Sequence, residues 1–388
     1  MKQSNQQRVG RLLLICLGMF FLASLGRTEP VIENEIALKL PENPIDGSQV
    51  FVAKGCIQCH TVWGFGESFG PDLSRIGQTM DFFDLAGGLW SHSPRMMEVM
   101  EEKGIERPTL TAEETEKLLT YIYYLGFFEE PGEYARGEII YKEKRCGRCH
   151  SLGGGKGIRL DRFGIYISPV FMAAELWNHA AAISPSMGTS SLAPGELAHL
   201  LAYIRGEALN KKAEINYILP GNPLEGKKVF QNKNCFVCHG PNGEGLKKNL
   251  LKKGLTEIVS LMWNHSYPMW QKIKQKGLSI PRFAAPEMAD LLTFLYFLPF
   301  SGERGNPQRG KEIFVNKGCI NCHGQSSPGK KPAPDLKIEA GLSASELISR
   351  LWNHIPQMRR MVDELNLAWP TFAKDEMKHL IYFINSLQ

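Results

Sequence analysis

The chain has 388 residues, of which 43% are hydrophobic and 22% are charged, and this balance is typical of a folded globular protein rather than a disordered one. A chain of this length accommodates two to four domains. The formal net charge is +5, but three of the positive charges lie within the first 26 residues. No basic cluster in the remainder indicates nucleic acid as a partner.

The first 26 residues have the pattern of an export signal. Lys2, Arg8 and Arg11 precede an apolar run from Leu12 to Leu25, which is followed by Gly26. The run of about 14 residues is short for a membrane span, which needs about 20. We therefore expect an exported, extracytoplasmic protein whose residues 1–26 form a signal peptide cleaved near Gly26. The alternative is an uncleaved N-terminal membrane anchor, which would be the chain's membrane contact.

Eight of the nine cysteines occur in one pattern, Cys-x-x-Cys-His, which appears four times. A shuffled chain of this composition would contain far fewer than one such sequence, so the repetition indicates a function. The four copies are Cys56-Ile57-Gln58-Cys59-His60, Cys146-Gly147-Arg148-Cys149-His150, Cys235-Phe236-Val237-Cys238-His239 and Cys319-Ile320-Asn321-Cys322-His323.

This pattern is typical of covalent attachment of a c-type haem. Two thiols on one helical turn can add to the two vinyl groups of a haem, and the next histidine can bind its iron. Thioredoxin-like redox sites and zinc sites also use Cys-x-x-Cys, but neither requires a histidine after every motif. The sequence therefore predicts four covalent haem c groups, each held by the two cysteines of a motif, with His60, His150, His239 and His323 as proximal iron ligands.

The four motifs start at residues 56, 146, 235 and 319, and this near-even spacing indicates one structural unit for each. A glycine lies nine residues before each first cysteine and an aromatic residue five before it. Apolar residues at helical spacing close each unit at 113–125, 196–204, 287–298 and 376–387, again with a recurrent aromatic residue. We expect a first and a last helix that cross on the two aromatics. The expected domains are 42–128, 129–207, 220–300 and 301–388, named repeats 1 to 4. The glycines are Gly47, Gly137, Gly226 and Gly310, and the aromatic pairs are Phe51/Tyr121, Tyr141/Tyr203, Phe230/Phe294 and Phe314/Phe383.

A first helix that leads into Cys-x-x-Cys-His, a loop and a last helix with an aromatic partner resembles the class I c-type cytochrome family, over about residues 42–388. The resemblance implies an all-α fold of four tandem cytochrome c-like domains. In that family the carbonyl of a proline in a Gly-Pro-x-Leu loop holds the second ring nitrogen of the proximal histidine. Gly70-Pro71-Asp72-Leu73 matches this loop and Ala333-Pro334-Asp335-Leu336 nearly does, whereas repeats 2 and 3 lack the proline.

The family's usual sixth iron ligand, a methionine directly before a proline ahead of the last helix, is missing from three repeats. Arg107-Pro108, Ile280-Pro281 and Trp369-Pro370 stand in its place. Each repeat instead contains Trp-x-His followed by proline and methionine. We favour the methionines as distal ligands, because the proline suits the first turn of a new helix, with Ser93 or Ser184 as its cap. These methionines are Met96, Met187, Met269 and Met358.

The histidine of each Trp-x-His segment is the alternative distal ligand, since imidazole is a strong ligand for haem iron and two imidazoles give a lower reduction potential. These residues are His92, His179, His265 and His354. In a third interpretation the tryptophan and histidine line the haem edge and bind a propionate. The two remaining histidines, His199 and His379, fall in last helices, where we expect surface positions.

Four haems in consecutive repeats predict an electron carrier that passes single electrons between extracytoplasmic redox proteins, its donor and its acceptor. No catalytic residue is expected on this interpretation, and the oligomeric state is left open. One alternative is a haem-bearing subunit of a membrane redox complex or polymer. Another is a haem enzyme such as a peroxidase, which needs one haem with an open sixth position.

Overall fold

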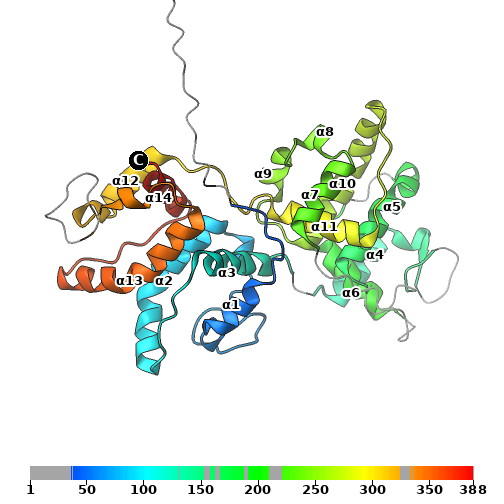
Figure 1. Ribbon diagram of the computed structural model, residues 1–388. Helices are drawn as coiled ribbons and strands as arrows, with labels where there is room; N and C mark the ends of the chain where they lie inside the picture. The colour runs from blue at the N-terminus through cyan, green and yellow to red at the C-terminus, as the bar shows by residue number, and fades with distance from the viewer. Residues whose placement is uncertain are drawn as a thin grey trace, which may run out of the picture. The chain divides into compact units, whose positions relative to one another are not determined.

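A computed structural model describes residues 36–387, apart from 37, 130, 153–157, 162–166, 188–190, 209–220, 324–332 and 334 (Figure 1). The side chains of 158 and 180–187 are also outside the description. The predicted signal peptide or anchor at 1–26 therefore lies outside the described residues. Residues 36–388 form one compact unit.

Helices dominate the described part of the chain, as the sequence predicts, and each repeat contains the same four elements in the same order. The opening helices are α1 (Gly47–Ala53), α4 (Tyr134–Glu143), α7 (Pro223–Asn232) and α12 (Pro307–Asn316). The motif turns are η1 (Cys56–Gln58), η3 (Cys146–Arg148), α8 (Phe236–His239) and η6 (Cys319–Asn321). The long helices are α2 (Phe82–Lys103), α5 (Pro169–Met187), α10 (Leu255–Gln275) and α13 (Ala344–Glu364). The closing helices are α3 (Ala112–Leu125), α6 (Glu196–Gly206), α11 (Ala285–Phe297) and α14 (Glu376–Asn385).

Short elements fill the loops between the motif turns and the long helices. Those described are η2 (Ile76–Gln78), η5 (Glu244–Leu246), α9 (Lys247–Leu250), η7 (Leu336–Glu339) and a parallel pair of two-residue strands, β1 (His150–Ser151) and β2 (Ile158–Arg159). All four closing helices begin and end within two residues of the predicted ranges.

The predicted crossing of opening and closing helices is confirmed in every repeat. The rings of the aromatic pairs lie 6.0, 5.4, 5.4 and 5.5 Å apart, from repeat 1 to repeat 4. The recurrent glycine lies at the crossing itself: a Cβ added to Gly226 would lie 2.0 Å from the carbonyl oxygen of Asp290, and the other three glycines meet a closing-helix carbonyl at the same distance. Only glycine permits this close approach of two helix backbones.

The expectation of surface positions for the two spare histidines is wrong for His379, which is 6% exposed. Its Nδ1 accepts a hydrogen bond of 2.8 Å from the backbone N–H of Asn306, the residue before α12. His199 accepts the equivalent bond from Glu133 before α4, and Asp290 accepts one from Asn222 before α7. These side chains satisfy a backbone donor at the start of the opening helix, where an intrahelical partner is lacking.

Candidate functional site

Each motif turn folds tightly and carries its two cysteines and histidine together. A residue with a left-handed backbone conformation lies one or two positions before each turn, for example Gly55 (φ 75°) and Gly318 (φ 78°). The turn is closed by hydrogen bonds such as those from the N–H of His60 to the carbonyl of Cys56 and from His323 to Cys319, both 2.9 Å. All eight motif cysteines are free of disulfides, so their sulfurs are available for another covalent bond.

The first cysteine of each motif lies in a largely apolar environment. Burial raises the pKa of the Cys56, Cys235 and Cys319 thiols to about 11, and it raises the pKa of Cys146 as well. Redox-active cysteines work as thiolates and require the opposite shift. Among the described residues, moreover, no group of three or more His, Cys, Asp or Glu side chains could hold a metal ion by itself. An uncharged thioether, in contrast, suits this environment.

Repeat 1 has the orientation of the proximal histidine that the resemblance implies. The Nδ1 of His60 lies 3.0 Å from the carbonyl oxygen of Pro71, which leaves Nε2 to bind a metal. Gly70 packs against the imidazole, because a Cβ there would lie 2.6 Å from the ring. The equivalent Pro334 of repeat 4 lies outside the described residues.

Asp72 fixes the loop that carries Pro71. Its carboxylate accepts hydrogen bonds from the Thr61 hydroxyl and from the backbone N–H groups of Gly64 and Ser74, at 2.8 to 3.1 Å. Although burial acts in the opposite direction, these hydrogen bonds and Ser74 in particular hold the pKa of Asp72 far below its usual range. The carboxylate therefore stays ionised and keeps the loop closed over the histidine.

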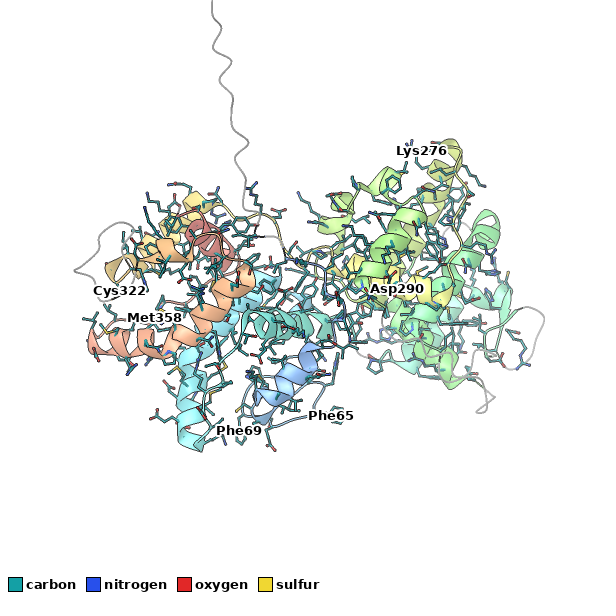
Figure 2. The ribbon with its side chains drawn as sticks, in the orientation of Figure 1. Phe65, Phe69, Lys276, Asp290, Cys322 and Met358 are labelled. Atoms are coloured by element: carbon teal, nitrogen blue, oxygen red, sulfur yellow. The ribbon has the colours of Figure 1, made fainter. Side chains whose placement is uncertain are left out.

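Repeat 4 contains a cavity of 470 Å³ beside its motif turn, within the range of about 300–1,000 Å³ that is usual for ligand sites. Cys319 and His323 line one part of it, and His354 and Met358 line another. Figure 2 shows Cys322 on the motif turn and Met358 on α13. Both candidate distal ligands thus lie in the wall of the cavity that contains the proximal histidine. An apolar cavity with free thiols and an imidazole fits a covalently held haem.

Repeat 2 brings its two histidines together. The ring centroids of His150 and His179 are 6.1 Å apart, and the ring planes are inclined at 61° to one another. A centroid separation of roughly 6 Å would leave room for one metal ion bound by both imidazoles, with bonds of about 2.0 Å. In repeat 3, burial lowers the pKa of His239, and the neighbouring His265 lowers it further. The residues present fit an iron between two histidines.

The expected helix start before each methionine is wrong. Pro94, Pro268 and Pro356 lie inside the long helices α2, α10 and α13, and α5 continues past residue 184 to Met187. Ser93 is no cap, because its Oγ donates to the Leu89 carbonyl within the same helix. Met96, Met269 and Met358 are half-buried against the core, and the side chain of Met187 lies outside the described residues.

In three repeats the indole N–H of the Trp-x-His tryptophan donates a hydrogen bond to a backbone carbonyl of another repeat. The indole Nε1 of Trp90 donates to the carbonyl of Pro370 at 2.7 Å, and that of Trp352 donates to Pro108 at 2.9 Å. Trp177 donates in the same way to Pro281 at 2.8 Å. The tryptophans therefore bind the segment in which the family carries its methionine. Repeats 1 and 4 each donate one such hydrogen bond to the other, and repeat 2 donates one to repeat 3.

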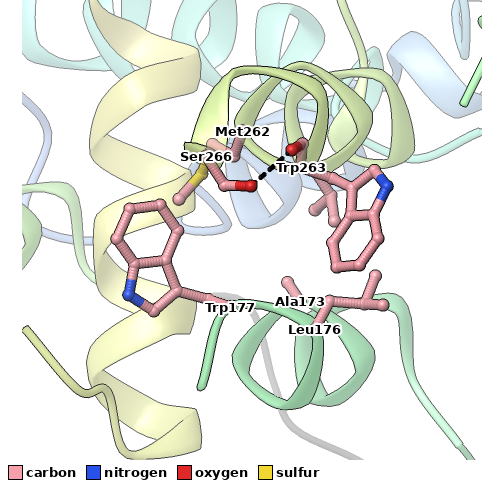
Figure 3. Close-up of a pocket in the computed structure, with 7 residues that line it drawn as sticks. Ala173, Leu176, Trp177, Met262, Trp263 and Ser266 are labelled. Atoms are coloured by element: carbon pink, nitrogen blue, oxygen red, sulfur yellow. Dashed lines mark hydrogen bonds between the residues drawn. The ribbon is translucent and has the colours of Figure 1, made fainter. Parts of the chain in front are cut away.

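The residue between tryptophan and histidine makes a second contact of the same kind. Each asparagine pairs with the backbone N–H and carbonyl of one residue in the other repeat: Asn178 with Phe283, Asn264 with Leu192, and Asn353 with Leu110, at 2.8 to 3.0 Å. In repeat 1 the position is Ser91, whose Oγ accepts only the N–H of Phe372, at 3.0 Å. We name these tryptophan and asparagine (or serine) contacts the latch. Figure 3 shows Trp177 and Trp263 on either side of a cavity of about 10 Å³ between α5 and α10.

In two of the long helices, the internal proline frees a backbone carbonyl that accepts a hydrogen bond from another repeat. Proline lacks an N–H, so the carbonyl four residues earlier has no partner within the helix. For Pro94 this is the carbonyl of Trp90, which accepts the indole N–H of Trp369 at 3.4 Å; for Pro356 it is that of Trp352, which accepts the Arg107 guanidinium at 2.7 Å. Arg107 also stacks on Trp352, with its Cζ 3.7 Å from the ring centroid. These roles were not predicted from the sequence, although a proline four residues after the tryptophan was their signal.

Comparison with known proteins supports the same kind of site in the C-terminal half. Residues 224–295 and 307–388 each match the sequence model of the family described as Cytochrome c. The two ranges contain the motifs at Cys235 and Cys319, and the match implies covalently bound haem c and electron transfer. No curated protein and no solved structure matches the chain. Within the described ranges, no helix has both the length and the apolar character that a membrane crossing requires.

Proposed function

We propose that the chain is a tetrahaem c-type cytochrome that transfers single electrons between extracytoplasmic redox proteins. The observation that carries this proposal is the fourfold recurrence of one arrangement: a glycine crossing, an aromatic pair, a Cys-x-x-Cys-His turn and a long helix with histidine and methionine. Repeats 3 and 4 match Cytochrome c, and repeats 1 and 2 share their arrangement. In each repeat the two cysteines hold the haem and the motif histidine binds the iron.

We further propose that the Trp-x-His histidines, rather than the methionines, are the distal ligands. The separation of 6.1 Å between His150 and His179 supports this assignment. The methionines were favoured because a helix was expected to start at the preceding proline. The prolines lie inside helices instead. The latch also supports it: with the tryptophan and the next residue fixed to another repeat, the histidine position is fixed on the same helical turn.

The chain's residues bind, orient and shield the cofactor. When bound, each haem supplies an iron that changes between the ferric and the ferrous state. Paired imidazoles set a lower potential than an imidazole with a thioether. Pro71 orients His60, and the apolar walls of the cavity, such as Leu347 and Leu351 in repeat 4, keep water from the ligands.

A count of haems tests the tetrahaem proposal. The protein, produced with a c-type haem maturation system, should carry four covalent haems by mass spectrometry of the intact chain. The double variant Cys56→Ala, Cys59→Ala should carry three. A wild-type protein with haems only in repeats 3 and 4 would contradict the proposal.

A matched pair of substitutions in repeat 4 tests the distal ligand, because both candidates line the same cavity. His354→Ala should convert one of four haems to a high-spin form in electron paramagnetic resonance and in the absorption spectrum. Met358→Leu should leave the spectra of all four haems unchanged. The far-red thioether-to-iron band should be absent from the spectrum of the wild type. The reverse pattern would assign the methionine. A high-spin haem in the wild type that binds cyanide would instead favour the enzyme alternative.

A further inference from the structure

Repeats 1 and 3 exchange equivalent contacts through their closing helices. The hydroxyl of Tyr123 donates to the carbonyl of Tyr296 at 2.9 Å, and the hydroxyl of Tyr296 donates to the carbonyl of Tyr123 at 2.7 Å. Both residues are buried, and their ring centroids lie 4.8 Å apart. Each tyrosine stands two residues after the crossing aromatic of its repeat, Tyr121 or Phe294. The exchange is therefore the contact of two equivalent surfaces.

A second reciprocal exchange follows the same symmetry. The N–H of Phe82, which begins α2, donates to the carbonyl of Phe300, and the N–H of Leu255, which begins α10, donates to that of Phe127, both at 3.0 Å. Phe127 and Phe300 each stand four residues after the exchanging tyrosine. An approximate two-fold axis between Tyr123 and Tyr296 accounts for both exchanges.

The latch attaches the other two repeats to this central pair. Repeat 4 is bound to repeat 1 through Trp90, Trp352 and Asn353, and repeat 2 is bound to repeat 3 through Asn178 and Asn264. The same helices carry the packing: α13 lies on α3, α2 on α14, and α5 on α10 and α11. Figure 1 shows α13 beside α2 and α3, and α5 beside α10.

The contact between repeats 1 and 4 reaches the haem cavity itself. Trp90 of repeat 1 lines the cavity of repeat 4 together with His323 and His354. On its own helix Trp90 stands two residues before His92, the proposed distal ligand of repeat 1. One side chain thus belongs to the wall of one site and to the ligand helix of the other.

We infer that the four repeats are connected in the order 4–1–3–2, and not in the order of the sequence. The redox consequence of this inference rests on the proposed function. Electrons pass between repeats that the hydrogen bonds described above join, so repeats 1 and 3 are the inner positions of the chain of haems and repeats 4 and 2 are its ends. In each step one ferrous iron is oxidised to ferric and one neighbouring ferric iron is reduced. No bond is made or broken, and redox proteins at the two ends supply and remove the electron.

Removal of single haems separates this order from a sequential one. Without the repeat 1 haem (Cys56→Ala, Cys59→Ala), haem 4 should lose exchange with the other two. Without the repeat 2 haem (Cys146→Ala, Cys149→Ala), the remaining three should stay connected. A substoichiometric pulse of a one-electron reductant, followed by freeze-quench spectroscopy, should show one of three haems equilibrating slowly in the first variant only. Isolation of a haem in the second variant only, or equal behaviour of both, overturns the inference.

Hydrogen exchange tests the order without reliance on electron transfer or on a haem-deleted fold. Asn353→Leu removes the acceptor for the N–H of Leu110, so the segment around Leu110 in repeat 1 should exchange about tenfold faster. Asn385→Leu is the control, since Asn385 bonds Gly341 within repeat 4, and it should leave repeat 1 unchanged. If Asn353→Leu leaves the Leu110 segment protected, repeats 4 and 1 are not in contact and the order is wrong. If this exchange result holds but fewer than four haems are found, only the proposed function fails.

Discussion

The indoles of Trp90 and Trp369 stack with their centroids 4.7 Å apart, although the two residues belong to the first and the last repeat. Trp90 donates to the carbonyl of Pro370, and its own carbonyl receives the indole N–H of Trp369. The segment that carries the distal methionine in the cytochrome c family is thus held in an interface between repeats. In the proposed assignment the ligand for the sixth position comes from the long helix instead.

Trp90→Phe tests how much this contact contributes to stability. The substitution removes the hydrogen bond to Pro370 and, because phenyl is smaller than indole, part of the stacking on Trp369. We expect the free energy of unfolding to fall by about 2 kcal/mol or more, since the lost packing adds to the usual net value of one hydrogen bond. Urea unfolding monitored by circular dichroism measures the change.

Trp63→Phe is the matched control for that measurement. It makes the same substitution in the same repeat, in the loop after the motif turn and away from the latch. Its effect should be smaller than that of Trp90→Phe, because the Trp63 side chain is only half-buried and its hydrogen bond to Ser74 is made by the backbone N–H. Equal losses in the two variants would show that the latch bond contributes nothing beyond the change of ring.

Ser91→Asn should strengthen the latch where it is weakest. Three repeats pair an asparagine with both the N–H and the carbonyl of the facing residue, whereas Ser91 accepts only the N–H of Phe372. An asparagine can add a donor for the Phe372 carbonyl, so we expect a gain of about 0.5–1 kcal/mol in unfolding free energy. Ser91→Ala should lose a similar amount. A neutral or destabilising Ser91→Asn would mean that the local geometry of repeat 1 does not admit the amide.

Local sequence patterns predicted the parts of the fold that depend on local contacts. The closing helices follow from apolar periodicity, and the glycine and aromatic positions follow from their recurrence at fixed distances from Cys56 and its counterparts. The orientation of His60 by Pro71 followed from the family's loop.

The patterns did not predict the contacts of the Trp-x-His segment, because its partners are remote in the sequence. Trp90 and Pro370 are 280 positions apart, and no periodicity connects them. Pro94 was misinterpreted for a related reason: a proline ordinarily marks a helix start, and it is tolerated inside α2 where another repeat supplies a donor to the carbonyl it frees. Contacts between repeats thus override the local rule.

Gly226→Ala should disrupt the fold of repeat 3. The new Cβ would lie 2.0 Å from the Asp290 carbonyl and 2.6 Å from the Phe294 side chain, so α7 and α11 would have to separate. We expect a loss of about 3 kcal/mol or more, comparable to severe overpacking. Thermal unfolding measures the effect. Gly88→Ala in α2 is the control, since its Cβ meets no atom within 4 Å and alanine favours a helix by about 1 kcal/mol. A Gly226→Ala protein as stable as Gly88→Ala would rule out the close helix crossing.

Asp81 should make stability fall as the pH rises. Burial and the neighbouring Asp84 carboxylate raise the pKa of Asp81 to about 6, against partial compensation by Lys378, with Asp375 also close. Because its pKa is higher in the folded state than in the unfolded state, the folded protein binds more protons, and stability decreases between about pH 4 and pH 6. The unfavourable contribution at neutral pH is at most about 3 kcal/mol.

Asp81→Asn should remove this penalty. Asparagine caps a helix as well as aspartate does, so the bond from the N–H of Asp84 can persist. The variant should therefore be more stable than the wild type at pH 7 and similar to it near pH 4, as measured by urea unfolding across this range. Asp72→Asn is the control with the opposite sign: the pKa of Asp72 is lowered by its hydrogen bonds, so this variant should be less stable at pH 7, with the difference shrinking as the pH falls. Parallel pH profiles for wild type and Asp81→Asn would show that Asp81 is ionised in the folded protein without penalty.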